Sequence, residues 1–492
     1  MRKELLLFEK SSPGRRGASL PSLSPEEQGR LKLFPKDLRR TLPPPLPELS
    51  EPEVVRHFTR LSQWNYSIDT NFYPLGSCTM KYNPKINEEM ARLSGWVNSH
   101  PYQPEETIQG SLQLLYELEH YLAEITGMDA LSLQPAAGAH GELTGILMIR
   151  AYHQSRGRPR SKILIPDTAH GTNPASSTMA NYQTIQIKSS TEGRLSPRDV
   201  AAAMDDEVAA LMLTNPNTLG LFETHIKEIC DIVHKKGGLV YCDGANLNAI
   251  MGKTRVGDIG VDVLHINLHK TFTTPHGGGG PGAGPVGVKA ILKPFLPTPL
   301  IEKRGEVFSL NYNQPKSIGK VQAFYGNFGI LVRAYTYIRE MGPEGLKRVS
   351  ELAVLNANYI RKKLEGTFDI PFGQDILHEV IISDKTLKGT DVKTLDFAKR
   401  IIDYGMHPPT IYFPLVVPGA FMIEPTETES IETLDQFCEA MLSIAKEVQE
   451  TPEIVHKAPH TTRVGRIDEV KAARELRLRY SHDSSNKSIN KP

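Results

Sequence analysis

A lysine between an imidazole and a glycine-rich stretch is the most reactive combination in this sequence of 492 residues. His269 and Lys270 directly follow the apolar run 263–267, and glycines recur through 277–284. Burial at the end of an apolar strand deprives an ammonium group of its hydration, and a lysine in such a place is a nucleophile toward aldehydes. The glycines let the backbone lie close to a ligand or to another chain. We therefore interpret Lys270 as a residue that binds an aldehyde covalently.

An aspartate at the end of another apolar run supplies a second reactive group. Asp243 ends the run 239–243 and precedes Lys270 by 27 residues, which is the length of one strand–helix–strand unit. A carboxylate is costly to bury in such a place unless it meets a cation. A lysine for the aldehyde and an aspartate for the protonated pyridine nitrogen are what pyridoxal phosphate requires of a protein. The pair predicts a pyridoxal phosphate site.

Three further loops follow apolar runs, and each has a plain structural alternative. The turn 134–142 is rich in small residues and leads into a helical window, which suits phosphate binding but is also common in ordinary strand-to-helix turns. His170 lies in the polar loop 167–174, where a lone histidine is more often structural than functional. The loop 214–220 is polar and is equally typical of a well-made turn.

The elements that must position these loops can be read from short apolar runs. Runs rich in Ile, Leu and Val predict strands at 162–166, 184–188, 209–214, 239–243 and 263–267. Helical windows at 196–206 and 225–236 lie between some of them. Strands that alternate with helices form a mostly parallel sheet covered on both faces, and ligands bind at the carboxyl ends of its strands. We expect an α/β large domain with the reactive loops at one edge of its sheet.

The chain divides into four predicted parts. Residues 1–110 form an N-terminal arm and helical segment, 111–326 the large α/β domain, and 327–450 a smaller α+β domain with long helices. Residues 451–492 form a C-terminal extension with a polar, disordered tail from 481. The first 50 residues are rich in proline and charge, so they form either an extended arm on a neighbouring surface or a free tail.

Composition excludes several classes of protein. Lys and Arg (57) balance Asp and Glu (56), which argues against general nucleic-acid binding. We find no apolar run of the ~20 residues that cross a bilayer, and the apolar start at 5–8 is too short for a signal peptide. Four cysteines without a Cys-x-x-Cys pair argue against a disulfide scaffold or a metal site. We expect a cytoplasmic multidomain enzyme.

Taken together, these motifs resemble the P-protein of the glycine cleavage system, glycine dehydrogenase (decarboxylating). The similarity runs from about Asn71 to Val448 and is to the lysine-bearing half of the two-subunit form. The segments that carry it are Leu-Gly-Ser-Cys-Thr-Met-Lys at 75–81, Ala-Ala-Gly-Ala-His-Gly-Glu at 136–142, the loop 167–176, and His-Lys-Thr-Phe at 269–272 with its glycine run. The resemblance implies fold type I, the aspartate-aminotransferase-like fold of pyridoxal-phosphate enzymes.

The resemblance also implies roles for individual residues. Lys270 would hold the cofactor aldehyde, Asp243 the pyridinium nitrogen, and His170 would stack on the ring with Ala245 on its other face. These implied roles make Lys270, His170 and Asp243 the catalytic set. The candidates for the cofactor phosphate are Ala137, Gly138, Ala139 and His269, and those for the ring hydroxyl are Thr214, Asn215 and Asn217.

The implied activity is that of an oxidoreductase of glycine catabolism. It decarboxylates glycine, releases CO2 and transfers the aminomethyl group to the lipoyl disulfide of a small carrier, the H-protein. The implied partner is P-protein subunit 1, in an α2β2 heterotetramer, with no nucleic acid and no membrane involved.

The sequence leaves other roles open. It singles out no residue for the glycine carboxylate, and Arg304 and Arg333 are weak candidates with surface roles as the alternative. Cys78 is interpreted as a structural cysteine, while Ser77, Thr79 and Lys81 either line the site or do not. The glycine loop 277–284 is either a lid or a close-packed interface.

Two other functions compete with this interpretation. Another fold type I enzyme, such as a cysteine desulfurase or an aminotransferase, would share the lysine and the aspartate. The desulfurase needs a catalytic cysteine in a C-terminal loop, but Cys438 falls in a helical window. A non-enzymatic scaffold that only completes a partner's site would have no need of Lys270 and Asp243.

Overall fold

The computed structural model of the protein describes residues 4–277, 280–476 and 478–480. Contacts divide the chain into two compact units. One runs from Ser67 to Pro459, and the other combines the residues up to Tyr66 with those from His460 onward. All the residues predicted to form the site belong to the first of these units.

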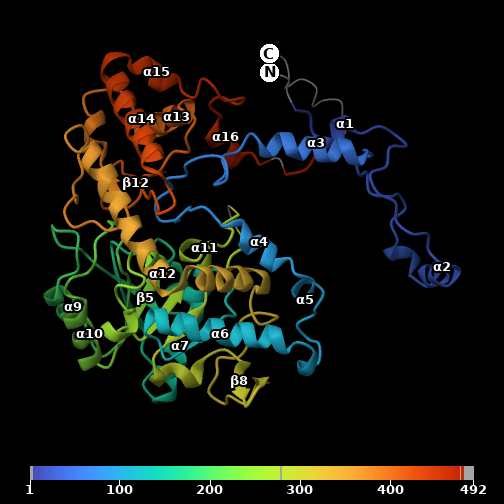
Figure 1. Cartoon of the computed structure of the whole chain (residues 1–492), viewed down its shortest axis with the longest axis horizontal. Helices are drawn as coiled ribbons and strands as arrows, with labels where there is room; N and C mark the ends of the chain where they lie inside the picture. The colour runs from blue at the N-terminus through green and yellow to red at the C-terminus, as the bar shows by residue number, and fades with distance from the viewer. Residues whose placement is uncertain (1–3, 278–279, 477, 481–492) are drawn as a thin grey trace. The chain divides into compact units, whose positions relative to one another are not determined.

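A seven-stranded sheet forms the centre of the large domain (Figure 1). Its strands follow the spatial order β1-β7-β6-β5-β4-β2-β3, and all are parallel except β7, which runs antiparallel to both of its neighbours. The mostly parallel α/β sheet predicted from the sequence is therefore confirmed. The strands are β1 (Ala130–Ser132), β2 (Lys162–Pro166), β3 (Gln183–Ile187), β4 (Val208–Thr214), β5 (Leu239–Gly244), β6 (Val263–Ile266) and β7 (Val286–Val288).

The central strands are apolar throughout because helices cover both faces of the sheet. Leu211 and Leu213 of β4 pack into a core shared with α6, α10 and the first part of α12, whereas Ala210 and Met212 pack into a core shared with α7. Figure 1 shows α6 and α12 side by side over the sheet. The helices of this domain are α4 (Lys85–Ala91), α5 (Ser94–Val97), α6 (Gln109–Thr126), α7 (Gly138–Ser155), α8 (Asn173–Met179), α9 (Pro197–Ala203), α10 (Ile226–Lys235) and α11 (Leu268–Thr271).

A smaller α+β domain follows the large one. It has a three-stranded antiparallel sheet in the order β10-β12-β11, with helices packed around a core of its own. Helix α12 (Phe328–Leu364) leads into it and changes direction at Gly342, where φ is 60° and Pro343 follows. The other elements are β10 (Val380–Ile382), β11 (Thr410–Ile411), β12 (Phe421–Ile423), α13 (Thr394–Asp403), α14 (Ile431–Glu450) and α15 (Pro452–Lys457), and a separate hairpin joins β8 (Leu300–Arg304) to β9 (Val307–Asn311).

The second unit brings the two ends of the chain together. The rings of Phe8 and Tyr480 stack with centroids 4.7 Å apart, and the Arg463 guanidinium lies 4.6 Å from the centre of the Trp64 ring. Its helices are α1 (Leu7–Lys10), α2 (Pro25–Lys32), α3 (Glu51–Ser62) and α16 (Glu469–Arg474). The predicted tail 481–492 lies outside the described residues. Among the helices that the structure describes, none is both long and apolar enough to cross a membrane.

Candidate active site

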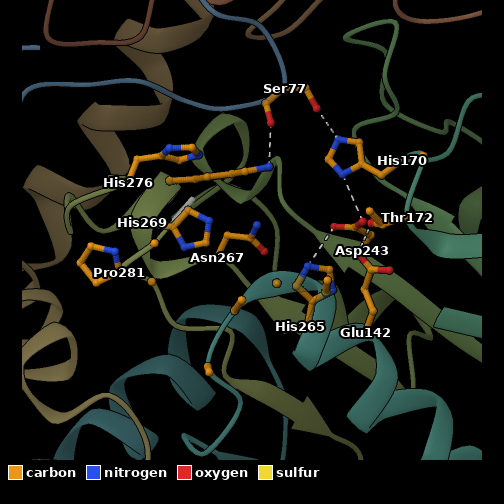
Figure 2. A pocket seen from close by; sticks show the side chains of 18 of the residues that line it. Ser77, Glu142, His170, Thr172, Asp243, His265, Asn267, His269, His276 and Pro281 are labelled. Atoms are coloured by element: carbon orange, nitrogen blue, oxygen red, sulfur yellow. Dashed lines mark hydrogen bonds and ion pairs between the residues drawn. The ribbon is translucent and has the colours of Figure 1, made fainter. Parts of the chain in front are cut away.

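A cavity of about 840 Å³ opens where β1, β2, β5 and β6 end. Figure 2 shows His170, Asp243, His265 and Glu142 on one side of it, and His269, His276 and Pro281 on the other. Seven of the predicted site residues line this cavity: Ala137, Gly138, Ala139, His170, Asp243, His269 and Lys270. The carboxyl edge of the sheet thus brings together residues that are far apart in sequence.

Lys270 lies on α11, the short helix that begins two residues after β6. Its side chain is buried, and the residue is 7% exposed. Nζ donates a hydrogen bond of 2.7 Å to the backbone oxygen of Ser77. The lysine is therefore fixed by the segment 75–81 and faces the cavity.

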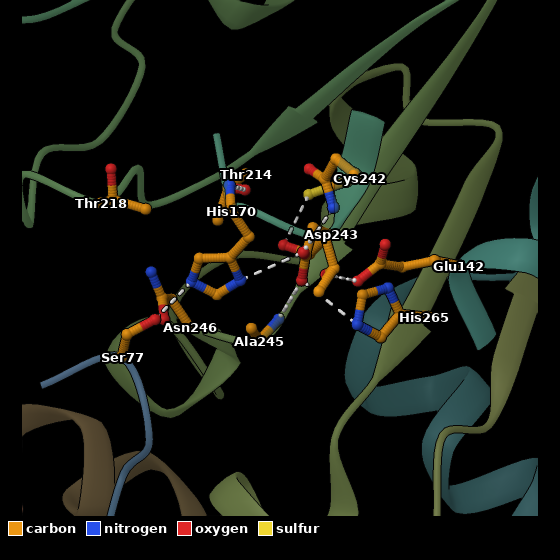
Figure 3. Close-up of polar contacts among 12 residues, drawn as sticks. Ser77, Glu142, His170, Thr214, Thr218, Cys242, Asp243, Ala245, Asn246 and His265 are labelled. Carbon is orange, nitrogen blue, oxygen red and sulfur yellow. Dashed lines mark hydrogen bonds and ion pairs between the residues drawn. The ribbon is translucent and has the colours of Figure 1, made fainter. Parts of the chain in front are cut away.

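Asp243 is fully buried at the end of β5 and is held on both carboxylate oxygens (Figure 3). Oδ2 lies 3.1 Å from His170 Nδ1 and accepts from Asn173 Nδ2 at 3.0 Å. Oδ1 lies 3.2 Å from His265 Nε2 and accepts from the Ala245 N–H at 2.9 Å. Burial favours a higher pKa for this carboxyl, but the two imidazoles outweigh it and hold the pKa of Asp243 well below its usual value.

His265 is a site residue that the sequence analysis missed. It is the cross-strand neighbour of Asp243 in the parallel ladder of β5 and β6, and its Nδ1 lies 2.7 Å from the hydroxyl of Tyr241. Tyr241, His265 and Asp243 thus form a buried row that leads from the core to the cavity wall. The order of the strands, which the sequence does not reveal, is what pairs His265 with Asp243.

His170 connects Asp243 to the segment 75–81. Its Nε2 lies 2.8 Å from Ser77 Oγ, and its backbone N–H donates to Thr214 Oγ1 at 3.1 Å. Figure 3 shows Ser77, His170, Asp243 and His265 in one continuous row of polar contacts. The imidazole ring is therefore held in place from both of its nitrogens.

One end of the cavity suits a phosphate group. Helix α7 begins at Gly138 and is 18 residues long, so its N-terminal N–H groups and its dipole favour an anion. A Cβ on Gly138 would lie 2.7 Å from the Asn267 amide, and one on Gly282 would lie 2.9 Å from His269 Nδ1. Both Asn267 Oδ1 and His269 Nδ1 are buried without a hydrogen-bond partner among the described residues. The small residues and these free polar atoms fit a phosphate-bearing ligand.

His269 is a neutral imidazole in this setting. Burial lowers its pKa to about 3, and the positive charge of Lys270 acts in the same direction. A bound phosphate dianion would favour the charged imidazolium and raise the pKa again. Residues 278–279 of the glycine loop lie outside the described residues. The two predictions for this loop, a lid and a close-packed interface, therefore both stay predictions.

Four predicted cofactor residues do not line the cavity. The Ala245 N–H donates to Asp243, and Thr214 accepts from the His170 N–H. Asn215 Oδ1 accepts from the Glu223 N–H. Asn217 accepts from the Leu219 N–H of its own loop and donates to Glu223 and to the backbone oxygen of Gly193. Their side chains shape the loop behind His170, and the structure does not bring them to the cavity wall.

The two arginines proposed for the substrate carboxylate also lie away from the cavity. Arg333 binds Glu88 through two hydrogen bonds of 2.7 and 2.8 Å, and the exposed Arg304 lies 3.0 Å from Glu302. All four cysteines are free. Cys438 lies inside α14, where a desulfurase nucleophile is not expected. Burial raises the pKa of Cys78 and keeps its thiol neutral.

The segment 75–81 crosses between the two domains. Ser77 and Thr79 have φ values of 66° and 44°, which residues with a side chain rarely adopt. Lys81 Nζ is buried and bonds to Glu427 of the small domain at 2.7 Å and to Asn248 of the large domain at 2.8 Å. Ser77 lines the cavity, whereas Thr79 and Lys81 do not.

In a mostly parallel sheet, Asp243 lies at the end of one strand and Lys270 follows the neighbouring strand. This arrangement defines a fold type I enzyme. Solved structures show the same fold: a glycine decarboxylase (P-protein) of the glycine cleavage system in inhibitor-bound form has a TM-score of 0.72, 19% identity, and covers 87% of this chain and 100% of its own. A cysteine desulfurase from Thermococcus onnurineus NA1 has a TM-score of 0.60, 16% identity, and covers 77% of this chain and 95% of its own.

Sequence relatives identify the family within this fold. The family model "Glycine cleavage system P-protein" matches residues 30–304, and "Glycine dehydrogenase, C-terminal domain" matches 349–462. A probable glycine dehydrogenase (decarboxylating) subunit 2 from Caldanaerobacter subterraneus subsp. tengcongensis is 58% identical over 477 residues, covering 97% of this chain and 98% of that protein. Its namesake from Listeria monocytogenes serovar 1/2a is 57% identical over 479 residues with the same coverage. The chain belongs to the glycine cleavage system P-protein family, which confirms the resemblance found in the sequence.

Proposed function

We propose that the chain is the lysine-bearing subunit of a glycine dehydrogenase and catalyses the pyridoxal-phosphate-dependent decarboxylation of glycine. The observation that carries the proposal is that Lys270 and the ionised Asp243 line one cavity at the carboxyl edge of the sheet. Family and fold support the same cofactor. The residues described above would hold its aldehyde at Lys270, its pyridine nitrogen at Asp243 and its phosphate at the start of α7.

When bound, the cofactor supplies an electron sink for the electron pair that remains as CO2 departs. Asp243 serves this purpose by keeping a proton on the pyridine nitrogen, because His170 and His265 hold the carboxylate in its charged form. The backbone oxygen of Ser77 holds the amino group of Lys270 while the lysine is not bonded to the aldehyde. His170, fixed by Ser77 and Asp243, presents a rigid ring to the cavity.

The lining also suits loss of a carboxylate. Among the described residues around the cavity, Lys270 is the only lysine or arginine. A substrate carboxylate without an ion-pair partner from this chain gains more from becoming neutral CO2 than one held by a guanidinium. An uncharged setting therefore favours decarboxylation over tight binding of the carboxylate.

The proposal includes partners. The relatives are named as subunit 2, which implies a subunit 1, and we propose an α2β2 heterotetramer. We further propose that the aminomethyl group passes to the lipoyl disulfide of the H-protein, and that the enzyme is cytoplasmic. The place of the family in the glycine cleavage system supports the carrier.

The test is exchange of labelled bicarbonate into glycine, with lipoylated H-protein and with or without subunit 1. We expect exchange in the complete mixture, a visible absorption band on adding pyridoxal phosphate, and loss of both in Lys270→Ala. Lys289→Ala is the matched control, because Lys289 pairs with Asp129 outside the cavity. A coloured wild-type enzyme without exchange would contradict the assignment to glycine, and a colourless one would contradict the cofactor.

A further inference from the structure

Two buried glutamates of the small domain meet beneath the segment 75–81. Strands β10 and β12 pair antiparallel with Val380 opposite Ile423. Glu379 immediately precedes β10 and Glu424 immediately follows β12, so the two carboxyl groups lie on neighbouring strands. Both residues are 0% exposed. One carboxylate oxygen of each and one ring nitrogen of His378 lie within 4.8 Å of one another. The mechanism above assigns no role to this cluster.

The two carboxyl groups bind the backbone of the segment that touches Lys270. The Ser77 N–H donates to Glu379 Oε1, and Thr79 donates to Glu424 from its N–H at 2.9 Å and from its hydroxyl. These bonds compensate for the unfavourable left-handed backbone of Ser77 and Thr79. The same geometry turns the Ser77 oxygen to Lys270 Nζ and the Ser77 hydroxyl to His170. Ser77 therefore links Glu379 to Lys270 through its backbone N–H and its backbone oxygen.

The hydrogen-bond pattern calls for one proton on the pair. Both oxygens of Glu424 and one of Glu379 accept bonds from the segment, whereas Glu379 Oε2 has no hydrogen-bond partner among the described residues and lies 3.9 Å from His378 Nε2. Two ionised carboxylates buried side by side repel each other. A proton on Oε2 removes one charge and gives this oxygen a hydrogen bond to donate. Burial and the neighbouring Glu424 raise the pKa of Glu379 accordingly.

The other titratable groups around the pair do not remove this need. His378 is fully buried, and its Nε2 lies 3.9 Å from Glu379 Oε2, which is too far for a hydrogen bond. Burial lowers the pKa of His378 to about 3, so the imidazole is neutral and brings no positive charge to Glu379. Cys78 keeps a neutral thiol, and Glu427 is paired with Lys81. Lys270 is the nearby cation, and one cation balances one carboxylate of the pair.

A metal ion is the alternative occupant of such a cluster. Two carboxylates and an imidazole are donors that divalent metals accept. Three of the four carboxylate oxygens, however, already accept N–H or O–H bonds from the segment, which leaves one free oxygen and one imidazole. That is fewer ligands than a structural metal site provides. The geometry favours a proton.

We propose that Glu379 and Glu424 share one proton and, in that state, act as positioning residues that hold Ser77 against Lys270 and His170. The proposal rests on the proposed function only in that Lys270 binds the cofactor aldehyde. The shared proton keeps the pair at a single negative charge. Ionisation of both carboxyl groups would place two charges under the segment and weaken the bonds that fix it.

The first test is infrared spectroscopy of the full chain without cofactor at neutral pH. A protonated carboxyl group has a carbonyl stretch that is separate from that of carboxylates. Glu119, whose pKa burial raises to about 8, contributes to this band in every variant. We therefore expect the difference spectrum to show the loss of one protonated carboxyl group in both Glu379→Gln and Glu424→Gln, because either change leaves one ionised carboxylate. Glu447→Gln is the control, since Arg400 lowers the pKa of Glu447 and keeps it ionised. An undiminished band in either variant would overturn the sharing, as would one equivalent of zinc retained by the wild type after dialysis.

The second test measures the positioning of Lys270 through the rate at which the empty chain captures pyridoxal phosphate, followed by absorbance against pH. Glu379→Gln keeps an acceptor for the Ser77 N–H and is neutral, as the protonated acid is. The pH midpoint of cofactor capture by this variant should therefore match that of the wild type. Glu379→Ala removes the acceptor of the Ser77 N–H. Ser77 is then no longer held in place, and the ammonium of Lys270 should lose its hydrogen bond to the Ser77 backbone oxygen. We expect its midpoint to fall by about one pH unit.

A lower midpoint in Glu379→Gln would overturn the proposal, because it would show that Glu379 carries a charge in the wild type. Equal midpoints for Glu379→Ala and the wild type would overturn the positioning role. Thermal unfolding of each variant verifies that it is folded. Neither test depends on glycine, so a chain that behaves as expected here but fails to exchange bicarbonate would contradict the proposed function alone.

Discussion

The two sides of the cavity are held together in different ways. On the side of the sheet, Asp243, His265 and Lys270 come from adjacent parallel strands or directly after them, and the backbone ladder sets their spacing. On the other side, Ser77 meets Glu379 from 302 residues away, and Thr79 meets Glu424 from 345 residues away. Those contacts are side-chain hydrogen bonds from buried acids to a strained backbone. The first side is fixed by the fold itself, whereas the second depends on protonation.

This difference predicts where the enzyme is robust and where it is sensitive. A change on the sheet side should remove chemistry and leave the architecture in place. A change on the side of the segment should act on stability and on pH dependence as well. Each of the following substitutions tests one part of that division.

The largest effect is expected at Asp243. Asp243→Asn removes the negative charge that keeps the pyridine nitrogen protonated, and we expect the exchange rate to fall by roughly 10³-fold. Asp262→Asn is the control: this carboxylate is also buried and also paired with an imidazole, His234, but it does not line the cavity. Exchange at more than a tenth of the wild-type rate in Asp243→Asn would contradict the role of the aspartate.

The next effect concerns stability against pH. The pKa of Glu379 is raised in the folded chain above its usual value of 4.5, so the native state keeps a proton that the unfolded chain releases. The stability that this proton confers is complete below pH 4.5 and is lost as the pH rises toward the native pKa, by up to about 1.4 kcal/mol per pH unit. Denaturant unfolding between pH 5 and 8 should show this decline, and Glu379→Gln should make it shallower; Glu119 and Glu429, whose pKa values burial raises to about 8 and about 7, supply the decline that remains. An equal slope in the variant would place the titration elsewhere.

A smaller effect is expected at Thr79. Thr79→Val replaces the hydroxyl that donates to Glu424 with a methyl group of similar size, and it leaves a buried carboxylate short of one donor. We expect the free energy of unfolding to fall by about 1.5–3 kcal/mol. Thr79→Ser keeps the hydroxyl and serves as the matched control in the same denaturation series. A loss in Thr79→Val no larger than that in Thr79→Ser would contradict the role of the hydroxyl.

The smallest effect is expected at Arg304, one of the arginines considered for the substrate carboxylate. Its side chain is 79% exposed and lies outside the cavity, so Arg304→Ala should leave the KM for glycine and the exchange rate within about twofold of the wild type. A tenfold rise in KM would show that a rearrangement brings this arginine to the substrate.

The side of the cavity formed by the sheet could be predicted from the sequence, because strands buried on both faces of a parallel sheet consist of near-continuous apolar residues. Asp243 and Lys270 interrupt or follow such runs, which made them visible as unusual residues. His265 lies inside a run and looks like a core residue until the strand order pairs it with Asp243. Strand β7 (Val286–Val288) was missed because it has only three residues next to a glycine- and proline-rich stretch.

The other side gave weaker signals. Glu379 and Glu424 also stand at the ends of apolar runs, 380–382 and 421–423, and the reasoning applied to Asp243 would have found them. The left-handed backbone at Ser77 and Thr79 could not be predicted from the sequence, because neither residue is a glycine, the residue type that usually marks a positive φ. Thr214, Asn215 and Asn217 were chosen for being polar after a strand, but their hydrogen bonds join the loop to His170, Glu223 and Gly193 and do not reach the cavity wall.

Helix α12 connects the edge of the active site to the core of the small domain. The helix starts beside the cavity, where Asn327 donates to the backbone oxygen of Ala136, and it ends in the core of the small domain. Its two halves meet at Gly342, whose φ of 60° sets the angle between them and whose missing Cβ faces open space. Beyond Gly342, Leu346 and Val349 still pack in the core of the large domain, and Ala357, Ile360 and Leu364 pack in that of the small domain. The second half of α12 is therefore a rigid strut anchored in both domains, and it ties the small domain, with Glu379 and Glu424, to the sheet that carries Lys270.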